Sequence, residues 1–89
     1  MRFVWDERKR RSNLNKHGLE FSDAPLVFQG DFFYLADDRQ DYGETRYIGI
    51  GELSDRVIVI VFCVVAEETY RIISMREATP RERELFYGS

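Results

Sequence analysis

The segment that most constrains the fold is the ten-residue run VIVIVFCVVA at residues 57–66, which contains no charged side chain. A helix that crosses a bilayer needs about 20 apolar residues, so this run is too short to span a membrane. It is apolar at odd and even positions alike, which predicts a strand covered on both faces. We therefore expect residues 56–65 to form a central strand. Cys63 should be buried there as a small apolar residue, and as the only cysteine it can form no internal disulfide.

Further segments of the chain are typical of strands. Residues 31–37 are rich in aromatic side chains, residues 44–52 alternate on one face, and residues 69–75 are β-branched and apolar. The links between these segments are short, which favours antiparallel neighbours and predicts a four-stranded antiparallel meander. The glycines of GIG at 49–51 fall inside a strand and indicate a bulge or a close approach of another group.

Two helices are expected before the meander. The first runs over residues 6–18, with Asp6 as its N-cap and Gly18 as the left-handed residue that ends it. Its apolar stripe is thin, so it should be exposed or lie against a polar partner. The second is short, over residues 22–28, with Ser22 as its predicted cap.

A closing helix is predicted by the capping box of Thr79 and Glu82, with Pro80 at its first position. The expected fold class is therefore α+β: a short N-terminal strand at residues 2–5, two helices, the four-stranded antiparallel meander and a C-terminal helix. The length predicts a single domain over residues 1–89. The helices can cover one face of the sheet, and the doubly apolar strand requires cover on the other face by the last helix or another chain.

The charge is unevenly distributed along the chain. The net charge is −3, yet residues 1–17 carry six Lys or Arg against two acids, and residues 20–68 carry eleven acids against three arginines. The acidic whole argues against indiscriminate nucleic-acid binding, while the basic end permits a local anion site. The N-terminus lacks the apolar segment of a signal peptide, and the lone thiol fits a reducing compartment, so a cytoplasmic location is expected.

Metal and cofactor sites are not predicted. One histidine and one cysteine are too few for a structural zinc site. The sequence DDRQD at residues 37–41 lacks the glycine and the final glutamate of a calcium loop, so a solvated acidic turn is expected there.

The lone imidazole, His17, follows Lys16 near the end of the first predicted helix. A histidine there gains from the helix dipole whatever else it does, so a capping role is one interpretation. A histidine also exchanges protons near neutral pH, which is the property a general acid or base needs. The spacing alone does not choose between these two roles.

Four charged residues of the predicted sheet complete a set of groups suited to phosphate chemistry. Glu44 and Arg46 should point to the same side of their strand, and Arg71 and Arg76 to opposite sides if pairing is regular. Arginine binds phosphate with two hydrogen bonds and stabilises charge that develops on it. Cations together with proton-transfer groups are what metal-free RNA cleavage requires.

Three stretches resemble the BrnT toxin family. Residues 5–28 match its opening pattern W-D-x-x-K-x-x-x-N-x-x-K-H-G-x-x-F-x-x-A-x-x-V-F, residues 43–46 match G-E-x-R, and residues 71–76 match R-I-I-S-A-R except at Met75. The stretches span almost the whole chain, and K-H-G followed by R-I-I-S-x-R is a specific combination.

The resemblance implies a RelE-like ribonuclease fold and a type II toxin that cleaves RNA and arrests growth. It implies a hetero-oligomer with a BrnA-like ribbon–helix–helix antitoxin, through which alone the toxin reaches operator DNA, and no membrane or cofactor. The residues it nominates are, for catalysis, Lys16, His17, Glu44, Arg46, Arg71 and Arg76, and for RNA binding, Lys9, Asn13 and Tyr87. The basic first helix, which has almost no apolar face, adds Arg8 and Arg11 as expected contacts of an acidic antitoxin segment.

Two departures from the family pattern leave an alternative open. Met75 stands where the family usually has alanine, and Val65 stands near a position where the family often has arginine. If that arginine is lost, Arg76 is the expected substitute. The alternative to an active ribonuclease is a weak or inactive module that binds the antitoxin and takes part in operon control.

Overall fold

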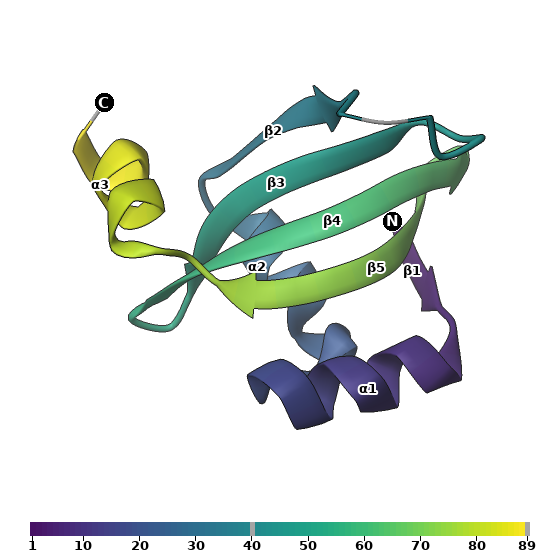
Figure 1. Cartoon of the computed structure of the whole chain (residues 1–89), viewed down its shortest axis with the longest axis horizontal. Coiled ribbons are helices and arrows are strands. Elements are labelled where there is room, and N and C mark those ends of the chain that lie inside the picture. The colour runs from purple at the N-terminus through teal and green to yellow at the C-terminus, as the bar shows by residue number, and fades with distance from the viewer. Residues whose placement is uncertain (40, 89) are drawn as a thin grey trace.

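The structure is a computed structural model and describes residues 1–39 and 41–88. Its elements in chain order are β1 Arg2–Trp5, α1 Glu7–His17, a 3-10 turn η1 Phe21–Asp23, α2 Ala24–Gln29, β2 Phe32–Asp37, β3 Arg46–Leu53, β4 Arg56–Ala66, β5 Thr69–Glu77 and α3 Pro80–Gly88. The strands form one five-stranded sheet in the order β1-β5-β4-β3-β2 (Figure 1). The α+β class and the antiparallel meander are confirmed, and β1 extends the meander by pairing parallel with β5.

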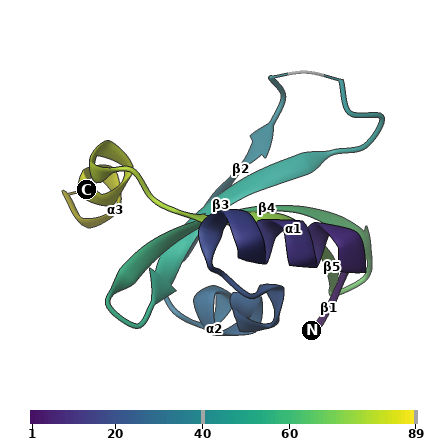
Figure 2. The ribbon, with the colours of Figure 1, turned by 60° about the horizontal axis from the view of Figure 1, so that its bottom comes forward.

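The sheet has two different faces. Helices α1 and α2 lie on the same side of the sheet and α3 lies apart from them (Figure 2). We call the side that carries α1 and α2 the helix face and the other side the second face. The main core lies on the helix face, where Ile58, Ile60 and Phe62 of β4 pack with Phe21 and Val27.

Strand β4 is covered on both faces over its first half, as its sequence predicts. On the second face, Val57 and Val59 are buried and pack with Ala78 and with Phe86 of α3. Towards its end β4 leaves this cover, and Val65, at an irregularity of the strand, is 45% exposed. The second face is therefore apolar and closed near α3, and open to solvent at the far end of β4.

Helix α1 is fixed by its caps and by one buried amide. Asp6 Oδ1 accepts the backbone N–H groups of Arg8 at 2.8 Å and Lys9 at 3.2 Å, and Gly18 closes the helix with φ of 69°. The Asn13 side chain donates to the Met75 carbonyl at 2.9 Å and accepts the Met75 N–H at 3.1 Å. These bonds occupy the amide of a residue that is 7% exposed, and they attach α1 to β5.

The predicted cap of the second helix is wrong. The turn η1 precedes α2, and the N–H of Ala24 bonds to the carbonyl of Phe21, so the chain enters the helix through backbone bonds rather than a Ser22 side chain. Proline lies in the first turn of α2, where its missing N–H leaves no bond broken.

Helix α3 begins with the predicted capping box and is held by a charge pair. Thr79 Oγ1 accepts the Glu82 N–H at 3.2 Å, and Glu82 Oε1 accepts the Thr79 N–H at 2.8 Å. Arg76 of β5 donates to both Glu82 oxygens, at 2.7 and 2.9 Å. These bonds, led by the Arg76 guanidinium, lower the pKa of Glu82 to about 2.

The glycines of β3 mark a close approach, one of the two expectations from the sequence. A Cβ added at Gly49 would lie 2.1 Å from Phe32 Cζ, and one at Gly51 would lie 2.9 Å from Val27 Cγ1. Only glycine lets the Phe32 ring lie flat over β3. No helix of the described chain is long and apolar enough to cross a membrane.

Replacing Gly49 with alanine should lower the free energy of unfolding by about 1–3 kcal/mol, the usual cost of overpacking, because the Phe32 ring must move. The control is Gly30→Ala, since an added Cβ at Gly30 meets no atom within 4 Å. Urea unfolding of both variants is the measurement. Equal stability of the two variants would show that the Phe32 ring moves without cost.

Replacing Glu82 with glutamine should make the chain less stable by about 1 kcal/mol near pH 7, since the partly exposed pair with Arg76 is screened by solvent. The pKa of Glu82 is lowered to about 2 from 4.5. Its charge therefore stabilises the fold above pH 4.5, and this contribution is lost as the pH falls towards 2. The difference between wild type and variant should shrink over the same range.

Urea unfolding at a series of pH values tests this expectation, and Glu84→Gln on the same helix is the control. Glutamine at position 82 still accepts the Thr79 N–H, so the cap is kept and only the charge is removed. A stability difference that is constant from pH 7 to 2 would contradict the ion-pair account.

Candidate functional site

An irregularity in β5 decides which residues share the second face. Arg71 lies opposite Cys63 of β4 and Arg76 lies opposite Val59, with a register shift between them that leaves Ile73 as an extra residue. The expectation that Arg71 and Arg76 point to opposite sides assumed regular pairing and is wrong. One extra residue reverses the alternation, so both arginines belong to the second face.

A polar cluster occupies the open end of this face. We call Glu44, Arg46, Cys63 and Arg71 the Glu44 cluster. Arg71 Nη2 donates to Glu44 Oε1, and Arg46 Nε lies 3.6 Å from Glu44 Oε2. The Cys63 thiol donates to Glu44 Oε2 at 3.2 Å and accepts from Arg71 Nη2 at 3.8 Å. The structure therefore brings together three residues nominated from sequence, Glu44, Arg46 and Arg71.

The cluster holds its carboxylate in the charged form. Hydrogen bonds from Arg71 and then from Cys63 lower the pKa of Glu44, and the bond to Glu44 raises the pKa of Arg71. Burial, followed by the bond to Glu44, raises the pKa of the Cys63 thiol. An ionised Glu44 between two guanidinium groups is a poor proton acceptor and is well suited to fixing the direction of both arginines.

Arg46 has an unused donor within the cluster. Its guanidinium carbon lies 4.1 Å from the centre of the Tyr42 ring, a cation–π contact that supports the head group from one side. Among the described residues, Arg46 Nε is buried and has no hydrogen-bond partner. A buried donor without a partner carries a free-energy cost, which an acceptor brought by a ligand would offset.

The sequence did not reveal that Cys63 belongs to this site. The prediction that Cys63 is buried is confirmed, since it is 2% exposed. Its bond to Glu44 was missed, because a cysteine inside an apolar run is normally a packing residue. The available signal is the strand register: Cys63 falls on the same face of β4 as Val59 and Val61, opposite Arg71.

Arg76 lies at the other end of the second face. It is four β4 positions from Arg71, which corresponds to about 13 Å along the strand. Val65 lies further still beyond Cys63, at an exposed second irregularity near the end of β4. The expectation that Arg76 replaces a cation at Val65 is therefore wrong on distance. Arg71 is the arginine near Val65.

Lys16 and His17 lie on the helix side of the sheet. They end α1, which Asn13 attaches at Met75, next to Arg76 in β5 (Figure 1). Among the described residues, no hydrogen bond or ion pair links His17 to the Glu44 cluster. The six residues nominated for catalysis thus fall into three places: the Glu44 cluster, Arg76 with its partner Glu82, and the end of α1.

The acidic turn after β2 is not simply solvated. Asp37 is 7% exposed and accepts from Arg39 Nε at 2.7 Å, Arg39 Nη2 at 2.9 Å and Tyr42 Oη at 3.1 Å. The bonds from Arg39 lead the effects that lower the pKa of Asp37 to about 2. The expectation of a solvated turn is wrong for Asp37, while Gln40 of this segment lies outside the described residues. No group of three His, Cys, Asp or Glu among the described side chains is placed to hold a metal ion.

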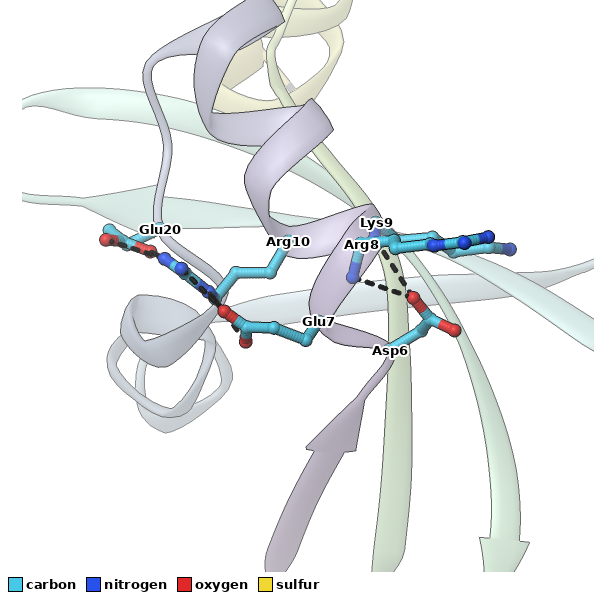
Figure 3. A network of polar contacts seen from close by, with 6 residues as sticks. All are labelled: Asp6, Glu7, Arg8, Lys9, Arg10 and Glu20. Atoms are coloured by element: carbon cyan, nitrogen blue, oxygen red, sulfur yellow. Dashed lines mark hydrogen bonds and ion pairs between the residues drawn. The ribbon is translucent and has the colours of Figure 1, made fainter.

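The basic residues of α1 differ in how their charge is used. Arg10 is neutralised by Glu7 at 2.7 Å and Glu20 at 2.9 Å, whereas Arg8 and Lys9 point away from these acids (Figure 3). Arg8, Lys9 and Arg11 are exposed and, among the described residues, form no ion pair. They leave an uncompensated positive surface on α1. Tyr87, nominated for RNA contact, lies on α3 and donates to Glu52 at 2.6 Å.

Two comparisons with known proteins found a match. Residues 5–82 match the family model described as the ribonuclease toxin BrnT of a type II toxin–antitoxin system. The structure is similar to the 1.1 Å crystal structure of the Brucella abortus ribonuclease toxin BrnT, with a TM-score of 0.67 and 34% sequence identity over 89% of this chain and 97% of that one. A comparison with curated protein sequences found no match. The chain therefore belongs to the BrnT family of ribonuclease toxins from type II toxin–antitoxin systems.

Proposed function

We propose that this chain is an endoribonuclease that cleaves RNA without a metal ion, arrests growth, and is neutralised by a BrnA-like ribbon–helix–helix antitoxin in a hetero-oligomer. The observation that carries the proposal is the Glu44 cluster, two arginines held by one ionised carboxylate on an open sheet face. Arginine supplies in this cluster the positive charge that a metal ion supplies in other nucleases.

The proposed reaction is an internal transfer at the RNA phosphate. A base takes the proton of the 2′-hydroxyl, the 2′-oxygen attacks phosphorus, and the bond to the 5′-oxygen breaks as that oxygen receives a proton. Arg46 and Arg71 bind the phosphate and stabilise the charge of the transition state through guanidinium N–H groups that Glu44 does not occupy. Glu44 orients both arginines.

Proton transfer is proposed for His17, with Lys16 beside it, on the support of the K-H-G match alone, because the sheet separates these residues from the Glu44 cluster. These residues lie on the helix side near the Arg76 end of β5, where β1 no longer pairs with β5. We propose that RNA bound by Arg71 and Arg76 on the second face passes around this edge of β5 to reach the end of α1. Lys9 on α1 and Tyr87 on α3 are proposed as outer RNA contacts. Asn13 is left out of this surface because its amide is bonded to Met75.

The antitoxin is proposed to place an acidic segment on α1, over Arg8 and Arg11. The support is the contrast within that helix, where Arg10 is paired with two acids and its exposed neighbours are not (Figure 3). An interaction of opposite charges at an exposed surface weakens as salt rises.

One set of observations favours the second candidate function, an antitoxin-binding module with little activity. Arg71 and Arg76 each already hold a carboxylate, and Val65 is an apolar residue near the cluster. RNA must displace Glu44 and Glu82 from these arginines before it can be bound by them. Growth after expression without antitoxin separates the two functions.

RNA cleavage in EDTA should fall by about 10²–10³ in Arg71→Ala, the usual cost of losing a group that stabilises the transition state.

His17→Gln should abolish cleavage and toxicity while the fold stays intact, because a side chain that caps a helix end contributes only about 0.3–1 kcal/mol. Arg56→Ala is the control, an exposed arginine whose partner is Glu77. A folded His17→Gln that remains fully toxic would remove His17 from the mechanism.

Val65→Arg should raise the rate of RNA cleavage, by up to about 10²-fold, since it adds a cation beyond Cys63 at an exposed position. Val64→Arg is the matched control: it adds the same charge one residue away, at a position that is 50% exposed and pairs with Tyr70. A missing cation does not limit activity if both variants cleave at the wild-type rate.

A further inference from the structure

An apolar groove separates α3 from the sheet on the second face. It has a volume of about 570 Å³. Phe33 and Leu35 of β2 form one wall, Leu85 and Phe86 of α3 form the other, and Ile48 and Val59 lie at its base. We call it the α3 groove. It begins where the cover of β4 by α3 ends, and the Glu44 cluster is not part of its lining.

The walls of the α3 groove expose large apolar side chains. Leu35 is 77% exposed, Leu85 is 66% exposed and Phe33 is 59% exposed. Contiguous exposed apolar surface of this kind marks a binding site more often than single exposed residues do. β2 is also the edge strand of the sheet, so no further strand covers this wall.

The charges at the ends of β2 restrict what can occupy the groove. Asp31 precedes the strand and Asp38 follows it, and residues 31–38 contain no Lys or Arg. Asp38 lines the groove together with Arg39, whose charge is paired with Asp37, and Asp31 lies just outside the lining at the other end of β2. Asp31 and Asp38 are exposed and have no ion pair among the described residues. The groove is thus apolar in the middle and negative at both ends of its β2 wall.

This pattern argues against a second copy paired through the β2 edge and against RNA. If β2 paired antiparallel with a second β2 about its centre, Asp31 of each copy would lie opposite Asp38 of the other, and like charges directly opposite destabilise a pair of strands. RNA is a polyanion and would meet the same two acids. A partner with positive ends and an apolar middle fits both features.

We propose that the antitoxin inserts an amphipathic helix into the α3 groove, with apolar residues against Phe33, Leu35 and Leu85 and with a Lys or Arg at each end, near Asp31 and Asp38. This proposal rests on the proposed function, and it adds a second contact to the one on α1. The apolar side chains project from the face of β2, so a strand added at its edge would lie beside the groove and leave it empty. The six residues of β2 span about 20 Å, which corresponds to a helix of about 13 residues.

The test measures binding of the purified antitoxin encoded with this toxin, at two salt concentrations. Leu35→Glu should weaken binding by at least about 30-fold, the effect of losing a central anchor. Leu26→Glu is the matched control, a leucine that is 54% exposed on α2 outside the groove, and it should stay within about 3-fold of wild type. Asp31→Asn with Asp38→Asn should weaken binding and reduce its dependence on salt.

Two further readouts separate this proposal from the proposed function. Leu35→Glu should cleave RNA at the wild-type rate and resist neutralisation by the antitoxin, and circular dichroism confirms its fold. If Leu35→Glu does not fold, Leu85→Glu on the opposite wall replaces it. Wild type that cleaves no RNA and binds no antitoxin would end the proposed function and this inference together.

Other outcomes overturn the inference alone. If folded Leu35→Glu and Leu85→Glu are neutralised as well as wild type, the antitoxin does not use the groove. If the free toxin is a dimer that Leu35→Glu dissociates, a second copy occupies the groove. If Leu35→Glu loses RNA cleavage while it still binds the antitoxin, the groove serves RNA.

Discussion

The burial of β4 on both faces is the constraint on which the rest of the structure depends. Ile58, Ile60 and Phe62 need η1 and α2 as cover, and Val57 and Val59 need Ala78 and the Phe86 side chain of α3. The sheet therefore cannot be a simple two-layer sandwich with one solvent face. Because α3 covers only part of the second face, the remaining part is available for the polar Glu44 cluster at one end and for the α3 groove beside it.

The Glu44 cluster depends on backbone geometry as much as on composition. Arg71 pairs with Cys63 on the second face and from there reaches Glu44. The extra residue Ile73 comes after this pair and leaves it unchanged. The same extra residue puts Arg76 on the second face, where Glu82 of α3 binds it. One irregularity thus supplies both the cationic site and the charge pair that attaches α3.

Much of the fold follows from signals that act locally. Asp6, Gly18 and the capping box of Thr79 and Glu82 begin or end helices through bonds within a few residues, and each of these predictions is confirmed. The strand predictions are confirmed because apolar alternation and short links leave few ways to pair. The cap at Ser22 was wrong because backbone bonds of a 3-10 turn took the place of the side chain.

The predictions that failed at the site all depend on register or on distance across the sheet. Whether Arg71 and Arg76 share a face, and whether Arg76 lies near Val65, depends on an extra residue that composition does not reveal. The burial of Asp37 depends on Arg39 and Tyr42 folding back over it. The grouping of Glu44 with Arg46 was predicted from strand alternation, but Glu44 lies in the bend before β3, so the pair forms without the alternation that predicted it.

Because of the extra residue at Ile73, the number of residues between Arg71 and Arg76 matters independently of which residues they are. Arg71 and Arg76 are five positions apart, whereas their β4 partners Cys63 and Val59 are four apart. Deleting one residue between the two arginines would therefore restore regular pairing. Both arginines would then keep their face, because residues four apart in regular pairing point the same way. Regular pairing with all the present residues kept would instead turn one of the arginines towards the apolar core. The extra residue is therefore what lets two arginines five positions apart share the second face, whatever side chains lie between them.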